Sequence, residues 1–432
     1  METQGKIKDV RKSALTLSLM NNQERNSLID KIKDAIDSNR AYLISENNKD
    51  LDNAKKNGIS DAVLHRLIFD DSKIDSSIKS LIAVKALECP TGKVVAKREL
   101  DYNLILEKVT YPLGVIGMVF EARPDAMIQI ISLALKSGNG IILKGGSEAS
   151  NTNKAIRKVI HEALIDDNYI LLLESHQDVD DMLKMEKDID LIIPRGSNKF
   201  VKYCMEHTNI PVMGHADGIC SIYVSDKADL NLATKVIIDS KIQYPAACNA
   251  VETLLINEKI AKVYLPILKR ELDLNHVVVH ADEKALKIID AIAARYDEFD
   301  REYLALELNI KVVSSLSEAI NHIANHSSHH TDCIISTDDN EIQTFFSSVD
   351  SADVFANCST RFADGFRFGL GAEVGISTSK LHARGPVGLE GLTTYKYQLT
   401  GNGQIVKDYA SGNKQFIHRE LMWWEIFPLL KE

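Results

Sequence analysis

Cys248 lies in a stretch whose residue types suit a catalytic nucleophile, YPAACNAVETLLIN at residues 244–257. A cysteine attacks as its thiolate, which requires an accessible sulfur and surroundings that lower the pKa of the thiol. Pro245 and the small alanines after it leave room for a substrate, and Asn249 would place a polar group beside the sulfur. The apolar, β-favouring residues that follow predict a strand that anchors this loop. The alternative is a small buried cysteine that takes no part in chemistry.

Two further segments suit an anionic ligand, because each places glycine between a predicted strand and a predicted helix. The first consists of Lys144, Gly145, Gly146 and Ser147, and the second of residues 194–198 (PRGSN). A helix N-terminus attracts negative charge, and glycine lets the backbone approach a phosphate closely. Neither segment has a GxGxxG or GxxxxGK[ST] pattern, so an ordinary glycine turn is the alternative at each. Two such loops in one sheet favour a nucleotide with more than one phosphate.

Arginines and glycines are concentrated in residues 357–391, where regular periodicity is weak. Arg361, Arg367, His382 and Arg384 all lie in this segment. Long loops without regular structure are uncommon in compact domains unless they have a function, so we expect a binding loop. A long glycine-rich surface connection is the alternative.

Four histidines gather in a short part of the chain, namely His322, His326, His329 and His330. The spacing of the first pair is compatible with a metal site. There is no HExxH pattern, no carboxylate at a clear ligand spacing, and no CxxC pair among the six cysteines. We therefore expect exposed or locally hydrogen-bonded histidines and no metal.

Periodicity divides the chain into helical and alternating parts. Residues 1–95 carry apolar residues at three- and four-residue spacing, which predicts a layer of helices. Residues 93–111 alternate and predict a β-hairpin. From residue 113 onward, strand and helix patterns follow one another, which predicts parallel sheets covered on both faces. Residues 392–409 predict a second hairpin with its turn at residues 401–403, and the two hairpins pair with each other or with a neighbouring subunit.

Composition sets wider limits on the protein. A chain of 432 residues is expected to form two or three domains, at about 100–200 residues per domain. The net charge of −10 argues against a general nucleic-acid surface. No apolar run is long enough to span a membrane, and the first residues lack the apolar core of a signal peptide. Scattered cysteines fit a reducing compartment, so we expect a cytoplasmic protein.

Seven segments together carry a resemblance to a known family: PLGVIGMVFEARPD, LKSGNGIILKGGSEA, DLIIPRGSN, GHADGICSIYV, YPAACNAVETLLIN, HSSHHTD and STRFADGFRFGLGAEVGISTSKLHARGPVGLEGLTTYKY. In this order they resemble γ-glutamyl phosphate reductases of the aldehyde dehydrogenase superfamily. The resemblance runs from about residue 8 to residue 409, and several segments are specific to that enzyme.

The resemblance implies an α/β fold like that of aldehyde dehydrogenases, with three parts and a tail. A Rossmann-type NADPH-binding domain would comprise residues 1–95, 112–243 and 352–385, and an α/β catalytic domain residues 244–351. A hairpin arm for oligomerisation would comprise residues 96–111 and 386–410. Residues 411–432, which include Trp423 and Trp424, form a tail beyond the resemblance.

The resemblance also implies an activity, the NADPH-dependent reduction of L-glutamate 5-phosphate to L-glutamate 5-semialdehyde in the second step of proline synthesis. Cys248 would be the nucleophile that forms a thioester, and backbone N–H groups or the Asn249 amide would hold the oxyanion. Basic side chains would meet the anionic substrate and cofactor, and the candidates are Arg123, Arg361, Arg367 and Arg384.

The cofactor contacts follow from the same resemblance. Lys144 and the Gly145, Gly146 and Ser147 turn would hold the adenosine side. Gly196 and Ser197 would lie beside the diphosphate, and Glu373 would hold the nicotinamide ribose. The implied partners are further copies of the chain. Contact with the glutamate 5-kinase that makes the labile substrate is a hypothesis, which a failure of the two active proteins to co-sediment would count against.

Two alternatives stay open. The first is a hydrolytic NAD(P)-dependent aldehyde dehydrogenase, which would turn over aldehyde without phosphate. This chain has His215 where such enzymes carry a glutamate base, which favours the acyl phosphate reaction and makes His215 a candidate substrate contact. The second alternative is a nucleotide-binding scaffold whose Cys248 is unreactive.

Overall fold

The computed structural model describes residues 2–421 apart from residues 60, 122, 197 and 215–216. The chain forms two compact units, each of which is described by itself. The first unit comprises Met1–Ile192, Thr208–Pro211 and Gly388–Glu432, and the second comprises Ile193–His207 and Val212–Val387. None of the helices in the described ranges has the length and apolar character needed to cross a bilayer.

The first unit begins with the predicted layer of helices, which is confirmed. Its elements up to the unit boundary are α1 (Glu2–Leu19), α2 (Asn22–Ser38), α3 (Arg40–Lys56), α4 (Asp61–Leu67), α5 (Asp71–Ala86), β1 (Val94–Asp101), β2 (Leu104–Pro112), β3 (Val115–Phe120), α6 (Pro124–Ser137), β4 (Gly140–Gly145), η1 (Ser147–Ala149), α7 (Ser150–Leu164), β5 (Ile170–Leu173), α8 (His176–Met182) and β6 (Leu191–Arg195). In the described residues, four of these strands form a sheet in the order β5-β4-β3-β6.

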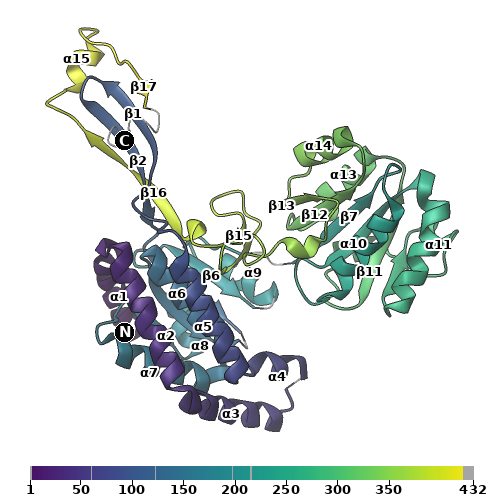
Figure 1. The fold of residues 1–432 in the computed structure, drawn as a ribbon, viewed down its shortest axis with the longest axis horizontal. Coiled ribbons are helices and arrows are strands. Elements are labelled where there is room, and N and C mark those ends of the chain that lie inside the picture. The colour runs from purple at the N-terminus through teal and green to yellow at the C-terminus, as the bar shows by residue number, and fades with distance from the viewer. Residues whose placement is uncertain (1, 60, 122, 197, 215–216, 422–432) are drawn as a thin grey trace, which may run out of the picture. The chain divides into compact units, whose positions relative to one another are not determined.

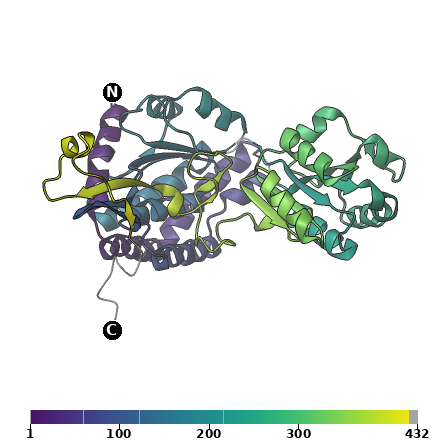
Figure 2. The same ribbon diagram turned by 90° about the horizontal axis from the view of Figure 1, so that it is seen from above.

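This sheet is covered because its central strands are apolar on both sides. Every residue of β3 and β4 is buried, as expected for parallel strands between two layers. Helices α1 and α6 both pack against β4, while α2 and α5 pack against α6. Figures 1 and 2 show this helical layer in purple and blue around the sheet. The carboxyl ends of β4 and β6 run into the two loops that the sequence singled out.

A second sheet of the first unit is the arm, in the order β16-β2-β1-β17, formed with β16 (Thr393–Thr400) and β17 (Arg419–Glu420). The first predicted hairpin is confirmed as β1 and β2. The second predicted hairpin is wrong, because β16 pairs along β2 and the chain after the turn forms the short helix α15 (Val406–Ala410) instead of a returning strand. Another short helix, η4 (Glu390–Leu392), precedes β16. The side chain of Gln404 caps this turn by accepting from Asn402 N–H and donating to Tyr102 O. The two segments thus pair with each other within one chain (Figure 1).

The second unit continues the alternation of strands and helices. Its elements are α9 (Asn198–Glu206), β7 (Cys220–Val224), α10 (Leu230–Ile242), β8 (Val251–Asn257), α11 (Glu258–Leu274), β9 (Val278–Ala281), α12 (Glu283–Leu286), β10 (Ile292–Ala293), η2 (Tyr296–Asp300), β11 (Glu307–Val313), α13 (Leu316–His326), β12 (Thr331–Ile335), α14 (Asp339–Ser348), β13 (Asp353–Ala356), η3 (Thr360–Phe362), β14 (Gly375–Ser377) and β15 (Gly385–Val387). Seven described strands pair in the order β10-β9-β11-β8-β7-β12-β13, and their pairs are parallel.

Two apolar clusters cover the two faces of this sheet. Side chains alternate along each strand, so Leu254 and Ile256 of β8 pack with α10 and α11, whereas Leu255 packs with α13 and α14. Figure 1 shows these pairs of helices in green on either side of the strands. The strand predicted after Cys248 is therefore confirmed as a central, fully buried strand.

The observed units differ from the domain boundaries drawn from the sequence. Strands β7 and β13 were assigned with the cofactor domain, yet both join the sheet that contains β8. The reason is that both sheets are built from the same β-α alternation. Periodicity identifies a strand, but it does not reveal which sheet that strand joins.

Candidate active site

Cys248 lies in a tight connection between α10, which ends at Ile242, and β8, which begins at Val251. Its thiol is half-buried. Within the connection, Ala247 N–H donates to Tyr244 O and Ala250 N–H donates to Ala247 O. The cysteine is thus held on a folded turn at the amino end of a rigid strand, with part of its surface open to solvent.

Gly218 lies directly against the backbone of Cys248. A Cβ at Gly218 would overlap the carbonyl oxygen and the Cα of Cys248, so a side chain has no room at this position. Nearby, the Cys220 thiol donates to Cys248 O at 3.3 Å. Burial raises the pKa of Cys220 well above its usual range, so this thiol stays protonated and supports the turn as a donor.

Three other cysteines are poor nucleophiles for the same reason. Burial raises the pKa of the buried Cys204 to about 11, and it raises those of the buried Cys333 and the half-buried Cys358. Cys89, the remaining cysteine besides Cys248 and Cys220, lies in the first unit beside Thr91. Among these six residues, Cys248 combines partial exposure with a tight turn.

A segment from the glycine-rich region fastens both sides of the Cys248 turn. Thr360 N–H and the Ser359 hydroxyl both bond to the Ser240 hydroxyl, at 3.2 and 3.1 Å. On the other side, Asn249 Nδ2 donates to Ala363 O at 2.7 Å. Residues 359–363, named here the clamp, therefore hold the turn at both ends. The structure gives Asn249 this anchoring contact, which the sequence did not predict.

Arg361 is the charged residue of the clamp. Its Nε donates to Gln243 Oε1 at 2.9 Å, and its guanidinium carbon lies 5.9 Å from the ring centre of Tyr244. Burial lowers the pKa of Arg361, as does the neighbouring charge of Arg367, whereas the charge of Cys248 acts in the opposite direction. A cation therefore lies beside the nucleophile's turn.

A buried ion pair closes the base of the same turn. Lys241, at the end of α10, lies 2.9 Å from Glu252 Oε2 at the start of β8, and both side chains are fully buried. Burial disfavours both charges, so it raises the pKa of Glu252 to about 8 and lowers that of Lys241. Their mutual attraction opposes both shifts.

The Lys144 loop differs from the expected phosphate site. Burial lowers the pKa of Lys144, whose ammonium group donates to Gly145 O at 2.6 Å. The N-terminus of α7 already has an anion, because the Asp50 carboxylate accepts from Thr152 N–H and Asn151 N–H at 2.8 and 3.1 Å. A phosphate at this helix end would meet that carboxylate, which argues against the phosphate hypothesis for this loop.

The remaining turn residues of this loop are fixed by their neighbours. A Cβ at Gly145 would overlap the Asn153 amide, and one at Gly146 would overlap the Glu148 carboxylate. Ser147 begins the short helix η1. A larger residue at either glycine would have to displace one of these two side chains.

The second loop lies at the end of β6 and brings two predicted residues into one neighbourhood. Gly196 is exposed directly after β6. Glu373 Oε2 accepts from Gly365 N–H at 2.7 Å, and Glu373 Oε1 lies 3.9 Å from Arg195. Ser197 lies outside the described residues. A partly exposed carboxylate beside an exposed glycine is an arrangement that can receive the hydroxyl groups of a ribose.

The other candidate arginines have carboxylate partners. Arg384 donates to Asp350 O and Oδ1, both at 3.0 Å. Arg367 lies 3.7 Å from Asp364. In the first unit, Arg123 lies 3.6 Å from Asp125. His215 lies outside the described residues.

The histidine cluster has local partners. His326 lies 2.7 Å from Asp300, His330 bonds to Thr331 at 2.8 Å, and His322 lies 3.2 Å from Lys311. In the described part of the chain, no group of three or more histidine, cysteine or acidic side chains is arranged to hold a metal ion.

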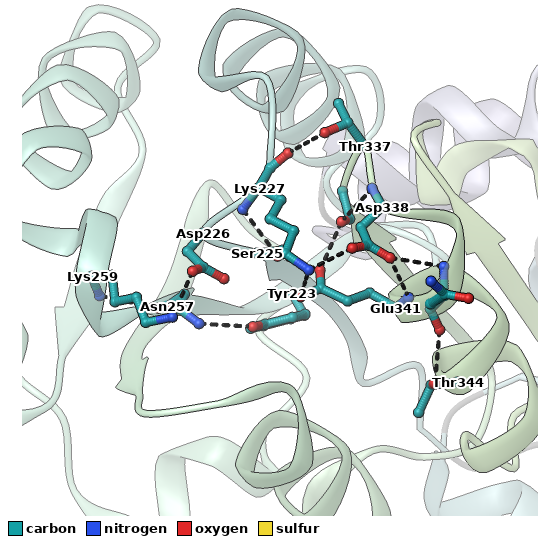
Figure 3. A network of polar contacts seen from close by, with 12 residues as sticks. Tyr223, Ser225, Asp226, Lys227, Asn257, Lys259, Thr337, Asp338, Glu341 and Thr344 are labelled. Atoms are coloured by element: carbon teal, nitrogen blue, oxygen red, sulfur yellow. Dashed lines mark hydrogen bonds and ion pairs between the residues drawn. The ribbon is translucent and has the colours of Figure 1, made fainter.

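The opposite end of the large sheet is closed by a polar network (Figure 3). At the carboxyl ends of β7, β8 and β12, Ser225 donates to Glu341 at 2.5 Å, Lys227 pairs with Asp338, and Asn257 donates to the Tyr223 hydroxyl at 3.0 Å. These polar groups at the carboxyl ends of the strands are bonded to one another, which leaves them poorly suited to bind a substrate. Cys248 precedes β8, so the candidate chemistry of this sheet lies at the amino ends of its strands.

Sequence reasoning missed the residues that position Cys248. Gly218, Ser240 and the backbone of Ala363 contact the turn from segments far away in the chain. Gly218 lies inside GHADGIC, one of the segments that carried the family resemblance, but no spacing rule connects it to the cysteine. The buried pair of Lys241 and Glu252 left a weak signal in the sequence, because a basic residue precedes the loop of Cys248 and an acidic residue follows it.

The comparisons with known proteins agree on one family. The model of the aldehyde dehydrogenase family matches residues 3–288. The chain is 49% identical to the γ-glutamyl phosphate reductase of Ruminiclostridium cellulolyticum over 413 residues, which are 95% of this chain and 96% of that protein. The chain belongs to the γ-glutamyl phosphate reductase family. A member from Acetivibrio thermocellus is also 49% identical, over 97% of this chain and 98% of its own length.

Solved structures of γ-glutamyl phosphate reductases support the same assignment. The enzyme of Thermotoga maritima covers 94% of this chain and 100% of its own, with 38% identity and a TM-score of 0.92. An acetylating aldehyde dehydrogenase from Geobacillus thermoglucosidasius shares 15% identity over 94% of this chain and 97% of its own, with a TM-score of 0.63, which concerns the fold alone. The predicted family and the aldehyde dehydrogenase-like α/β fold are confirmed.

Proposed function

We propose that this chain reduces L-glutamate 5-phosphate to L-glutamate 5-semialdehyde and phosphate, the second step of proline synthesis. The observation that carries the proposal is a half-buried cysteine on a turn held from both sides, with a guanidinium beside it, in a chain that belongs to the γ-glutamyl phosphate reductase family. An acyl phosphate is an activated carboxyl group, and it suits a thiolate nucleophile.

Cys248 acts first. Its thiolate attacks the acyl carbon, the bond from that carbon to the phosphate oxygen breaks, and phosphate leaves with the electron pair. The acyl group remains on Cys248 as a thioester. We assign the oxyanion to the backbone N–H groups of Cys248 and Asn249, because those of Ala247 and Ala250 bond within the turn and Asn249 Nδ2 donates to Ala363 O.

A reduced nicotinamide dinucleotide, when bound, would supply the hydride that the thioester carbon needs. Departure of the thiolate from the resulting thiohemiacetal then releases the aldehyde and restores Cys248. Water must stay away from the thioester, and a charged base beside it would favour hydrolysis. The protonated, buried Cys220 thiol below the turn is a donor and does not serve as such a base.

The residues that follow β6 fit such a cofactor, and we propose NADPH. Glu373 presents a carboxylate, held by Gly365 N–H, that would bond the nicotinamide ribose hydroxyls. Gly196 is exposed, and its backbone would lie beside the diphosphate. We propose the loop of Lys144, Gly145, Gly146 and Ser147, which belongs to the first unit, for the adenosine side.

We also propose that the protein is a cytoplasmic homo-oligomer. Strand β16 lies at the edge of the arm sheet and exposes three large side chains, Tyr395, Tyr397 and Leu399. An exposed, apolar edge strand is a template for pairing with another chain. Sedimentation of the purified protein at the mass of a single chain would contradict the oligomer.

The experiment that tests the reaction is its reverse. Purified protein is mixed with glutamate 5-semialdehyde and NADP⁺, with and without phosphate, and the reduced nicotinamide is followed by absorbance. We expect phosphate-dependent reduction that Cys248→Ala abolishes. The control Cys89→Ser, in the other unit, keeps the contact with Thr91 and retains the activity. Turnover without phosphate would favour a hydrolytic dehydrogenase, and cofactor binding without turnover would favour an inactive scaffold.

A further inference from the structure

Four arginines were candidates for the anionic groups of the substrate, and their surroundings separate them. Arg123, Arg367 and Arg384 each lie within ion-pair distance of an aspartate. Arg361 differs, because its Nε donates to the neutral amide of Gln243 and, among the described residues, no carboxylate lies within ion-pair distance of it, although the charges of Asp364 and Asp239 reach it. A half-buried cation without a carboxylate in direct contact is suited to an anionic ligand.

Arg361 is also fixed on the turn that carries the nucleophile. Gln243 and Tyr244, which contact its guanidinium, begin the connection that contains Cys248. Ala363, two residues further along the clamp, accepts a bond from Asn249. The clamp therefore contacts the chain on both sides of Cys248. Burial and the charge of Arg367 lower the pKa of Arg361, and the charge of Cys248 is among those that raise it, in agreement with this placement.

The remaining donors of Arg361 have the geometry that a phosphate needs. Since Nε is used by Gln243, the two terminal nitrogens form the edge that can donate a pair of parallel bonds to two oxygens. Arg367 Nη1 donates to Arg361 O at 2.7 Å and brings a second cation close by. Burial lowers the pKa of Arg361, and the repulsion between the two guanidinium groups lowers it further; an anion bound there would relieve that repulsion.

We propose that Arg361 binds the phosphoryl group of the acyl phosphate and stabilises the phosphate as it leaves. This inference rests on the proposed function. The phosphate is attached through one bridging oxygen to the carbon that Cys248 attacks, whereas the α-carboxylate lies at the far end of the substrate. A guanidinium beside the nucleophile's turn therefore meets the phosphate. It keeps its proton throughout, while the electron pair of the broken bond stays on the phosphate oxygen.

The kinetic test compares the Michaelis constants of the reverse reaction. For Arg361→Gln we expect the KM for phosphate to rise about 10- to 100-fold, the loss expected when a charge-assisted bond is removed. The KM for glutamate 5-semialdehyde should change by less than about twofold. Arg361→Lys keeps the charge without the fork and should give an intermediate value. The matched control is Arg270→Gln, since Arg270 is an exposed side chain on α11 of the same unit.

A second measurement does not depend on turnover. Iodoacetamide alkylates Cys248, and inorganic phosphate at constant ionic strength should slow this reaction in the unaltered protein but not in Arg361→Gln. Equal protection by phosphate in both proteins, or none in either, would overturn the inference, as would a raised KM for the semialdehyde alone. Arg361-dependent protection in a protein without phosphate-dependent turnover would uphold phosphate binding and refute the proposed reaction. An unchanged KM for phosphate in an active Arg361→Gln variant would refute phosphate binding by Arg361 and uphold the proposed reaction.

Discussion

Cys248 is set apart from the other cysteines by its neighbours more than by its own sequence context. Gly218 lets a second backbone segment lie directly beneath it, and the Cys220 thiol donates to its carbonyl oxygen. The clamp then adds Arg361 at one side and a bond to Asn249 at the other. The sequence identified the nucleophile from small residues around a cysteine. It did not reveal the supports, because they come from distant segments.

His322 provides a prediction about pH and stability. Burial, the charge of Lys311 and the neighbouring His326 lower the pKa of His322 from about 6.5 when unfolded to about 3. A depressed pKa contributes stability that is present above pH 6.5 and is lost as the pH falls toward 3. Between pH 7.5 and 5, His322→Gln should therefore lose about 2 kcal/mol less unfolding free energy than the unaltered protein.

Urea unfolding at the two pH values measures this difference. Because other groups also titrate, the informative quantity is the difference between the two proteins in the change with pH. His276→Gln, a substitution of a histidine in the loop after α11, serves as the control. An equal fall in unfolding free energy between pH 7.5 and pH 5 in all three proteins would show that protonation of His322 does not destabilise the folded state.

Helices and strands were largely predictable where the pattern is local. The apolar runs that became β3, β4 and β8 are fully buried strands, and the helical spacing before residue 95 gave α1 to α5. The prediction was wrong where pairing is not local. Residues 392–409 read as a hairpin because they alternate around a glycine turn, yet β2 offers β16 a complete set of backbone partners from residue 105 to residue 112.

The N-terminus of helix α7 is capped by a side chain from a distant part of the sequence, which changes what this helix end can bind. A glycine loop followed by a helix predicted a phosphate site, but Asp50 of α3 caps the N-terminus of α7. Asp50 is almost fully buried and also accepts from the Thr152 hydroxyl at 2.7 Å. The cap therefore joins two helices of the first unit.

Replacing this cap should destabilise the protein without a direct effect on Cys248 chemistry. Asp50→Ala leaves buried N–H groups without an acceptor, so we expect a loss of about 1–3 kcal/mol in the free energy of unfolding. Asp52→Ala, an exposed change on the same helix, is the control and should cost less than about 0.5 kcal/mol. Denaturant unfolding measures both values. A cost for Asp50→Ala no larger than that of the control would show that the cap is dispensable.

At the level of the whole chain, the sequence passes between two compact units, so that each unit is built from separate segments. Cys248, the clamp and the Glu373 neighbourhood belong to the second unit, while Lys144 and Arg123 belong to the first. The family could be predicted from seven segments, and the comparisons confirm it. The division into units could not be predicted from the sequence, because β7 and β13 belong to the same alternation of strands and helices as the strands of the other sheet.

In the proposed reaction, Cys248 carries the substrate as a thioester that phosphate, and not water, releases. This is tested most directly by mixing the protein with glutamate 5-semialdehyde and NADP⁺ without phosphate, quenching with acid within milliseconds to seconds, and weighing the intact protein. We expect a single acyl group on Cys248, absent from Cys248→Ala, which disappears when phosphate is added before the quench. Continued turnover without phosphate, or reduced cofactor with no acyl group on Cys248, would contradict it.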